Sequence, residues 1–237
     1  DLVLAVPSFR MVRQKFPDAH ISLLVDEKWI KIVENCPYLD EVIPFRRDKL
    51  WSLGLRFPAI IDLIRQKEFD ISIDFQNTSK THWLAFLGRI RERYGYRRGS
   101  AARLLNRGIT GFSNPLPPIE HQFQVIKQLG IEKLDDRLEL WTKPSEEERM
   151  RRTLEQSWTS EKAFLVGFVL GASAKWPTKR WSIESFVLLA DQLKTKFHAR
   201  IVLLGSGQDR SLAKEFLSKH REGVVDRPLP VALDVLE

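Results

Sequence analysis

The feature that most constrains the fold of this chain is a regular alternation between short apolar runs and longer stretches with an apolar residue at every third or fourth position. Short runs rich in β-branched residues predict buried strands, and the longer periodic stretches predict amphipathic helices. Along residues 2–129 the predicted elements alternate between helix and strand throughout. Such alternation predicts parallel sheets with helices packed against their faces.

Turn-forming residues set the limits of the predicted elements. Pro17 and Asp18 end the first helix, because proline cannot continue the hydrogen bonding of a helix. Three prolines between Gly111 and Pro118 predict a loop. The predicted helices are residues 2–16, 27–34, 57–67, 79–87, 121–129, 182–194 and 210–220, and the predicted strands are residues 20–25, 41–45, 70–75, 93–96, 164–170 and 200–204.

The composition is that of a chain able to bury a sizeable core. Of its 237 residues, 43% are apolar and 29% are charged, which is ordinary for a globular protein. A charged stretch at residues 142–162 separates two α/β patterns, so we place a linker helix region there. The predicted domains on either side are residues 1–141 and 163–237.

Both predicted domains lack part of a complete α/β arrangement. A parallel unit runs strand, helix, strand, whereas this chain opens on a helix, so we expect its first strand to be missing. Asp1 would then lie at the carboxyl end of that strand, the edge at which open α/β sheets bind ligands. About two and a half strand–helix units follow residue 163, too few for a typical sheet. We therefore expect truncation at both ends.

Cysteine content and hydropathy bear on the cellular compartment. Cys36 is the only cysteine, which excludes an intrachain disulfide and a cysteine-based zinc site. No apolar run approaches the roughly 20 residues of a membrane span. The first residues do not have the pattern of a secretory signal. These features together predict a cytoplasmic protein.

The net charge of +7 is unevenly distributed along the chain. Between Gly88 and Gly108 seven arginines accompany a single acid, Glu92. This excess favours an anionic partner such as a nucleic acid, an acidic membrane surface or a phosphorylated substrate. A solvated arginine-rich surface explains a segment this short equally well. The only aromatic residues beside the arginines are Tyr94 and Tyr96, few for stacking on bases.

The densest group of chemically useful residues is the segment Gly171–Trp181, read G-A-S-A-K-W-P-T-K-R-W. It joins a predicted strand to a predicted helix and combines small residues with the cations of Lys175, Lys179 and Arg180. Small residues let the backbone approach a ligand, and the amides at a helix start attract anions. The segment therefore predicts a phosphate or diphosphate site. The alternative is an ordinary helix start capped by Ser182.

Other nucleotide-binding motifs are weak or absent. Gly205-Ser206-Gly207 follows a strand, and Asp226 has the spacing of a ribose-binding acid, but Arg210 stands where a dinucleotide motif has its third glycine. A plain tight turn explains the same residues. The sequence has no two aspartates two positions apart, no P-loop and no histidine pair with zinc-ligand spacing. We therefore predict phosphate binding by lysines and helix amides, without a metal.

The segment G-A-S-A-K-W-P-T-K-R-W-S-I-E-S-F resembles a signature of the ADP-heptose:lipopolysaccharide heptosyltransferases, a family of inverting glycosyltransferases. The opening D-L-V-L-A-V-P-S-F-R-M-V-R-Q-K-F-P-D-A is similar to the first motif of that family. The resemblance spans nearly the whole chain and implies a GT-B type α/β fold, with two Rossmann-like domains built on parallel sheets. Other similar segments are residues 35–42 and 95–97, the helix that opens at His121, and residues 205–210.

The resemblance also implies roles for individual residues. Asp1 matches the general base that takes a proton from the acceptor hydroxyl, and Lys179 matches the lysine that neutralises the leaving diphosphate. No cofactor or metal is implied. The donor and nucleotide would be bound by Gly171, Ala172, Ser173, Lys175, Arg180, Gly205 and Asp209, and the acceptor by Arg97, Arg98 and His121.

The resulting hypothesis is a metal-independent transfer of heptose, with inversion, from ADP-heptose to the lipopolysaccharide inner core, most like the second heptosyltransferase. Its partners would be ADP-heptose and a phosphorylated lipid A–Kdo core acceptor, with a peripheral contact to the inner membrane and no nucleic acid. Two alternatives stay open: the same fold with another nucleotide-sugar donor, and a basic α/β module that binds nucleic acid. The missing first strand leaves the activity of the chain by itself open. Ser182 stands where the family usually has proline, and either can begin a helix.

Overall fold

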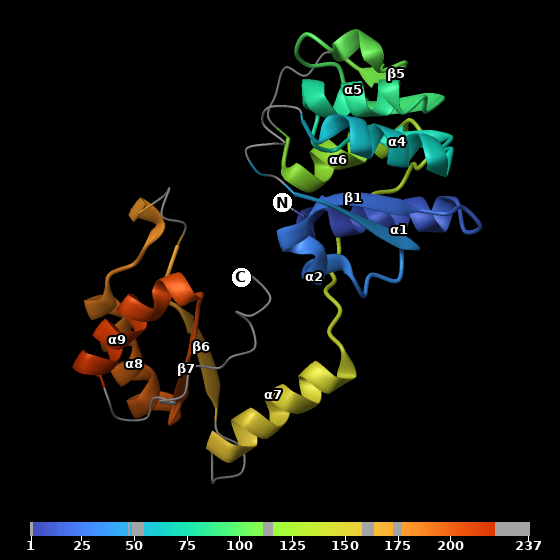
Figure 1. The fold of residues 1–237 in the computed structure, drawn as a ribbon. Coiled ribbons are helices and arrows are strands. Elements are labelled where there is room, and N and C mark those ends of the chain that lie inside the picture. The colour runs from blue at the N-terminus through green and yellow to red at the C-terminus, as the bar shows by residue number, and fades with distance from the viewer. Residues whose placement is uncertain are drawn as a thin grey trace. The chain divides into compact units, whose positions relative to one another are not determined.

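The computed structural model describes residues 2–46, 48, 55–110, 116–157, 164–172 and 177–220. The chain divides into two compact units, Asp1–Trp141 and Thr142–Glu237 (Figure 1). In both units the described strands pair in parallel, and helices alternate with them along the chain. The predicted α/β class is therefore confirmed.

The first unit opens with a helix that packs against a parallel pair of strands. Pro7 lies in the first turn of this helix, where its missing N–H removes no intrahelical hydrogen bond. Val6, Phe9, Val25 and Val33 are buried together and form the core of this layer. The elements are η1 (Val3–Ala5), α1 (Val6–Lys15), β1 (Ser22–Asp26), η2 (Glu27–Trp29), α2 (Ile30–Val33) and β2 (Glu41–Phe45).

The second sheet of the first unit contains three parallel strands in the order β3, β4, β5. Ile73 lies opposite Tyr94, and Tyr96 lies opposite Ile109. The sequence does not predict β5, because its three residues, Arg-Gly-Ile, carry no apolar period. The elements are α4 (Phe57–Lys67), β3 (Ile71–Ile73), α5 (Ser79–Leu87), β4 (Glu92–Tyr96), η3 (Ala102–Leu104), β5 (Arg107–Ile109) and α6 (Pro118–Lys127).

Two further apolar clusters hold the helices of the first unit together. Ile64 of α4 packs with Leu84 of α5, and Met11 of α1 packs with Ile126 of α6. A Cβ atom on Gly88, at the end of α5, would lie 2.4 Å from Ile64 Cγ2. Glycine at this position therefore lets α4 and α5 meet closely.

The second unit packs a parallel pair of strands against two helices. Phe168, Ile201 and Phe216 are buried together in this core. Ser182 caps α8, because its hydroxyl accepts the N–H of Ser185 at 3.1 Å, which confirms the helix start predicted there. The elements are α7 (Pro144–Ser157), β6 (Leu165–Val169), η4 (Pro177–Lys179), α8 (Ile183–Phe197), β7 (Arg200–Leu204), η5 (Gly207–Asp209) and α9 (Arg210–Lys219).

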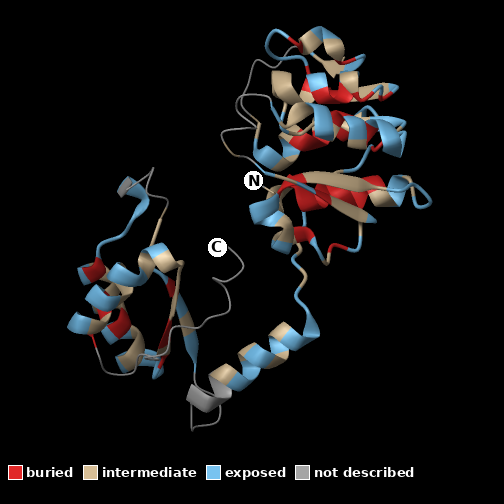
Figure 2. Ribbon diagram, viewed as in Figure 1, coloured by how far each residue is buried: buried red, intermediate tan, exposed pale blue. Residues whose placement is uncertain are grey.

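Burial follows the amphipathic pattern of the sequence. Figure 2 shows buried residues along α1 and within the sheets, whereas the described side chains of α7 are exposed or half-buried. A surface of this kind fits the charged sequence of α7, which has Glu146 and Glu147 in its first turn. In the part of the chain that the structure describes, no helix has the length and hydropathy required to cross a membrane.

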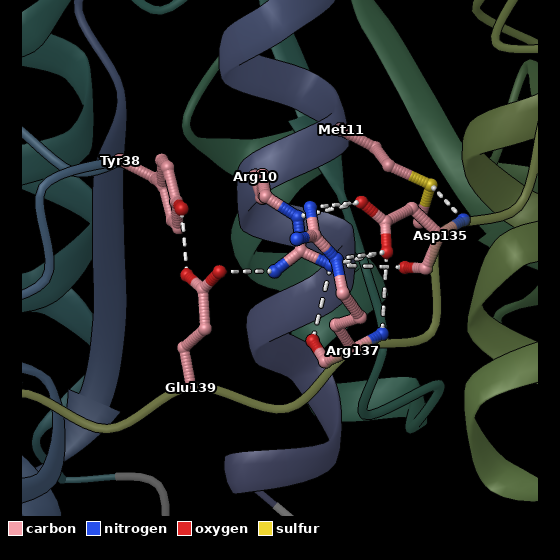
Figure 3. A network of polar contacts seen from close by, with 6 residues as sticks. All are labelled: Arg10, Met11, Tyr38, Asp135, Arg137 and Glu139. Carbon is pink, nitrogen blue, oxygen red and sulfur yellow. Dashed lines mark hydrogen bonds and ion pairs between the residues drawn. The ribbon is translucent and has the colours of Figure 1, made fainter.

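A buried arginine ties α1 to the segment at residues 134–141, which has no secondary structure. The side chain of Arg10 is 2% exposed, with Nη2 2.9 Å from Asp135 Oδ1 and Nη1 3.0 Å from Glu139 Oε1 (Figure 3). Its Nη2 also donates to the backbone carbonyl of Arg137 at 3.0 Å. Two carboxylates therefore compensate one buried guanidinium, which is the condition for burying a charge at acceptable cost.

The carboxylates around Arg10 have partners of their own. The hydroxyl of Tyr38 donates to Glu139 Oε2 at 2.6 Å. Arg137 is largely exposed and lies 3.0 Å from Asp135. Hydrogen bonds from Arg137, followed by the charge of Arg10, hold the pKa of Asp135 well below its ordinary value. The network therefore fastens the segment at residues 134–141 to α1 with charged contacts at both of its carboxylates.

Arg10→Ala should lower the free energy of unfolding of the first unit by about 3 kcal/mol, because two carboxylates lose a desolvated partner. This is the lower end of the range for a broken buried pair, since Asp135 and Glu139 are 27% and 29% exposed. Arg137→Ala is the matched control, because it removes an exposed guanidinium from the same carboxylate and should cost less than about 1 kcal/mol. Urea unfolding measures the free energy of unfolding of both variants. Equal losses of stability in the two variants would show that the burial of Arg10 does not strengthen its contribution.

The depressed pKa of Asp135 predicts a dependence of stability on acid. A carboxylate whose pKa is lower in the folded state adds stability above its unfolded pKa, and this contribution is lost as the pH falls below about 4. Asp135→Asn should therefore be less stable at pH 7 and should lose less of its remaining stability between pH 5 and pH 2. Parallel pH profiles for the two proteins would show that Asp135 contributes nothing to acid sensitivity.

Candidate functional site

The carboxyl ends of β6 and β7 bring four of the predicted donor-binding residues together, namely Gly171, Ala172, Gly205 and Asp209. The two strands pair in parallel, with Val169 opposite Leu204. The segments that follow them, which begin with Leu170 and Gly205, therefore leave the sheet at the same edge. In open α/β sheets this edge is where ligands bind.

Asp209 fills the space between these two segments. Its Oδ2 accepts the backbone N–H of Ser206 at 2.7 Å and the hydroxyl of Ser206 at 2.9 Å, which forms a capping box at η5. A Cβ atom on Gly171 would lie 1.9 Å from Asp209 Oδ1, and one on Gly205 would lie 3.1 Å from Asp209 Cβ. The two glycines are thus needed so that the Asp209 carboxylate can approach the backbone, a use that the sequence alone does not reveal.

The cations of the predicted anion site follow at the start of α8. Lys179 ends η4 and is exposed. Arg180 is also exposed, and its Nη2 donates to the carbonyl of Ala172 at 3.3 Å. This contact brings the residues before α8 next to the end of β6. Trp181 packs edge-on against Phe186 of α8, with ring centroids 5.0 Å apart.

The structure thus places Gly171, Ala172, Gly205 and Asp209 at one edge and connects Arg180 to it. Three other predicted site residues, Asp1, Ser173 and Lys175, lie outside the described residues, as does Asp226. Their roles stay predictions. Among the residues that the structure does describe, no group of three or more histidine, cysteine, aspartate or glutamate side chains is arranged to hold a metal ion.

The predicted acceptor-binding residues lie in the first unit, next to the carboxyl end of β4. Arg97 and Arg98 follow Tyr96 directly, and both are exposed. The ring of His121, in the first turn of α6, stacks on the ring of Tyr96 with centroids 4.0 Å apart. The hydroxyl of Tyr96 donates to the carbonyl of His121. Burial, followed by the charge of Arg98, lowers the pKa of His121.

Several arginines of the basic segment hold the backbone of the first unit. Arg93 Nε donates to the carbonyl of Leu104 at 2.6 Å, and Arg97 Nη2 donates to the carbonyl of Leu105 at 3.2 Å. A Cβ atom on Gly108 would lie 2.4 Å from Arg97 Cγ, so the stem of Arg97 covers β5. Arg107 lies 3.6 Å from Glu92. Part of the local positive charge therefore has a structural purpose.

A depression of about 500 Å³ lies at the amino end of β4, away from Arg97 and Arg98 at its carboxyl end. Three of the four arginines in its lining have acidic or backbone partners: Arg65 donates to the carbonyl of Leu87 at 2.9 Å, Arg91 lies 3.9 Å from Asp70, and Arg93 donates to the carbonyl of Leu104. The depression is lined by Arg65, Phe86, Leu87, Arg89, Ile90, Arg91 and Arg93.

Sequence reasoning missed a buried polar group at the carboxyl end of β3. The predicted strand at residues 70–75 includes Asp74, whereas β3 ends at Ile73 and Asp74 begins a turn. The signal that could have identified it is an acid after an apolar run, followed by the Thr78 and Thr81 capping box of α5. The side chain of Asp74 is 8% exposed, and burial raises its pKa.

The close approach of Asp209 to Gly171 predicts that Gly171→Ala is destabilising. A methyl group 1.9 Å from Asp209 Oδ1 must displace the carboxylate from Ser206, at a cost of about 1–3 kcal/mol to the free energy of unfolding. Asp209→Ala removes the obstacle, so the second substitution should reduce the cost of the first. A double-mutant cycle measures this coupling. Additive losses would mean that the two positions do not interact.

Comparison with known proteins links this geometry to one family. The family model of glycosyltransferase family 9 (heptosyltransferase) matches residues 59–228. Lipopolysaccharide heptosyltransferase 2 of Salmonella typhimurium is 26% identical over 226 residues, which cover 92% of this chain and 64% of that protein. The chain thus spans a little under two thirds of the length of this relative.

Solved structures show the same fold. The glycosyl transferase family 9 structure from Veillonella parvula has a TM-score of 0.82 and 20% identity, and the match covers 92% of this chain and 62% of that one. The Escherichia coli ADP-heptose lipopolysaccharide heptosyltransferase II has a TM-score of 0.70 and 20% identity, and the match covers 93% of this chain and 65% of that one. With a family match over more than half of its residues, the chain belongs to glycosyltransferase family 9, the heptosyltransferase family.

Proposed function

We propose that this chain forms the larger part of an inverting heptosyltransferase that transfers heptose from ADP-heptose to the lipopolysaccharide inner core without a metal. The observation that carries the proposal is the family match over residues 59–228. This range includes the donor edge of the second unit, which is the edge of the sheet where the segments after β6 and β7 begin. Relatives named as lipopolysaccharide and lipooligosaccharide heptosyltransferase 2 support the choice of substrates. Another nucleotide-sugar donor on the same fold is the nearest alternative.

The donor edge offers what the departure of a nucleoside diphosphate requires. When the bond to the anomeric carbon breaks, negative charge grows on the leaving ADP. A fixed cation and oriented backbone amides lower the barrier, because they are in place before the charge develops. Lys179 would supply the cation, and the start of α8 would supply amides beside it. Arg180, connected to Ala172, would add a second positive charge.

The acceptor side would work through residues of the first unit. Asp1 would act as the general base and take the proton of the acceptor hydroxyl. The hydroxyl oxygen would attack the anomeric carbon from the face opposite ADP. Attack from that face inverts the configuration at this carbon. Arg97, Arg98 and His121 would bind the phosphorylated lipid A–Kdo core acceptor. The acceptor is lipid-linked, so a peripheral contact with the cytoplasmic face of the inner membrane forms part of the proposal.

A nucleic-acid-binding function fits the basic segment less well. Arg93 donates to the backbone carbonyl of Leu104, and Arg107 lies 3.6 Å from Glu92. Tyr96 is 1% exposed and its ring stacks on His121, so it offers no free face to a base. These contacts occupy Arg93, offset the charge of Arg107 and leave little surface for stacking.

ADP binding tests the proposed function directly. In EDTA, ADP at one hundred times its Kd should raise the free energy of unfolding by about 2.7 kcal/mol. Lys179→Ala should raise the Kd of ADP about tenfold, equivalent to about 1.4 kcal/mol of binding free energy, because a cation beside the diphosphate is lost. Lys196→Ala is the matched control, since Lys196 is an exposed lysine in the last turn of α8 and should leave ADP binding unchanged.

Two results would contradict this function. One is a melting temperature that ADP does not change while RNA raises it in a salt-dependent manner. The other is equal weakening of ADP binding by the Lys179 and Lys196 substitutions. Asp1→Ala should retain ADP binding and lose transfer, so normal transfer by that variant would contradict the role of Asp1 alone.

A further inference from the structure

The turn after β3 is organised by one buried carboxylate. Asp74 Oδ1 accepts the backbone N–H of Asn77 at 2.8 Å, and Asp74 Oδ2 accepts the hydroxyl of Thr81 at 2.6 Å. The imidazole of His82 is fully buried, and its Nε2 lies 3.4 Å from Asp74 Oδ2. Asp74 thus connects the end of β3 to the first turn of α5.

Asn77 connects this turn to the neighbouring strand, β4. Its backbone has φ 50, a left-handed conformation that asparagine tolerates better than most residues with a side chain. This conformation directs Oδ1 of Asn77 to the backbone N–H of Tyr96, at 2.6 Å. A Cβ atom on Gly95 would lie 3.0 Å from the same oxygen, so the turn is packed tightly against β4.

Tyr96 completes the connection to α6. Its backbone is held by Asn77, its ring stacks on His121, and its hydroxyl donates to the carbonyl of His121. The contacts therefore run without a break from Asp74 through Asn77 and Tyr96 to His121. They join the ends of β3 and β4 and the start of α6, three elements that meet at the edge proposed for the acceptor.

We propose that Asp74 is a positioning residue that holds Tyr96 and His121, through Asn77, in the arrangement that binds the phosphorylated acceptor. The proposal deepens the function proposed above and rests on it for the acceptor. The carboxylate of Asp74 is itself too buried to meet a substrate, since its side chain is 8% exposed. Burying a carboxylate carries a desolvation cost, and at this position the carboxylate accepts from one donor in the turn after β3 and from one donor in α5.

The test compares variants that remove a hydrogen bond with variants that keep it. Asn77→Gly tolerates the left-handed conformation but loses the contact to Tyr96, whereas Asn77→Asp retains an oxygen for it. Asp74→Ala loses both acceptors, whereas Asp74→Asn can still accept from Asn77 and donate to Thr81. Asn106→Gly is the matched control, because Asn106 Oδ1 accepts the backbone N–H of Arg93 at 2.8 Å, at the opposite end of β4.

The first measurement is the titration of His121 by NMR in the full 237-residue chain, which has five histidines. Burial against Tyr96 keeps the pKa of His121 below its ordinary value. Asn77→Gly and Asp74→Ala should raise the titration midpoint toward about 6.5, whereas Asn77→Asp, Asp74→Asn and Asn106→Gly should leave it near that of the parent. An unchanged His121 in both disruptive variants, or an equal change in Asn106→Gly, would overturn the proposal.

The second measurement separates acceptor binding from donor binding. With a de-acylated, phosphorylated lipid A–Kdo acceptor as the probe, Asn77→Gly should raise the acceptor Kd about tenfold and leave the Kd of ADP unchanged. An equal rise in the Kd of both ligands would indicate general destabilisation of the protein and would overturn the proposal. If the parent chain binds neither ligand while the His121 titration responds as expected, the proposed function fails and the positioning of His121 by Asp74 stands.

Discussion

In a parallel pair both strands run in the same direction, so the residues that follow them leave the sheet at one edge. This constraint places Gly171 next to Gly205 in the second unit, although neither lies within a strand. The same constraint places the turn after β3 beside the end of β4 in the first unit. Gly171, Ala172, Gly205 and Asp209 follow β6 or β7, and Arg97 and Arg98 follow β4. The sites therefore depend on strand pairing more than on any single contact.

The elements that the sequence predicts well carry a local signal in their own residues. The observed bounds of β2, α4, α5 and β7 coincide with the predicted ones. Helix α4 has a proline in its first turn, and α5 begins after a threonine cap. Strand β5 carries no such signal. It is a strand because β4 provides partners for its backbone, which is a long-range property that a local pattern does not contain.

The same distinction separates site residues that a sequence motif predicts from contacts that only the fold creates. Lys179 and Arg180 are predicted as site residues because cations cluster within one short segment. The partners of Arg10 are separated from it by more than a hundred residues, and Asp209 meets Gly171 only after two strands have paired. A motif names the residue types that a site requires. Tertiary contacts decide whether a glycine makes room for a ligand or for a neighbouring carboxylate, as Gly171 does here for Asp209.

Two buried charged groups of the first unit, Arg10 and Asp74, are compensated in opposite ways. Arg10 has carboxylates around it, so the charges attract each other, and the pKa of Asp135 is lowered. Asp74 has mainly neutral donors beside His82, so desolvation outweighs the hydrogen bonds and raises its pKa. Because its pKa is raised, Asp74 lowers the stability as the pH rises from its unfolded pKa to its folded-state pKa. Because its pKa is lowered, Asp135 adds stability at lower pH, as the pH rises from its folded-state pKa to its unfolded pKa. The fold therefore gains stability at Arg10 and accepts a cost at Asp74, and that cost lies at the edge where His121 is held. A loss of stability at this edge is physically reasonable if the fixed positions of Tyr96 and His121 serve ligand binding rather than folding.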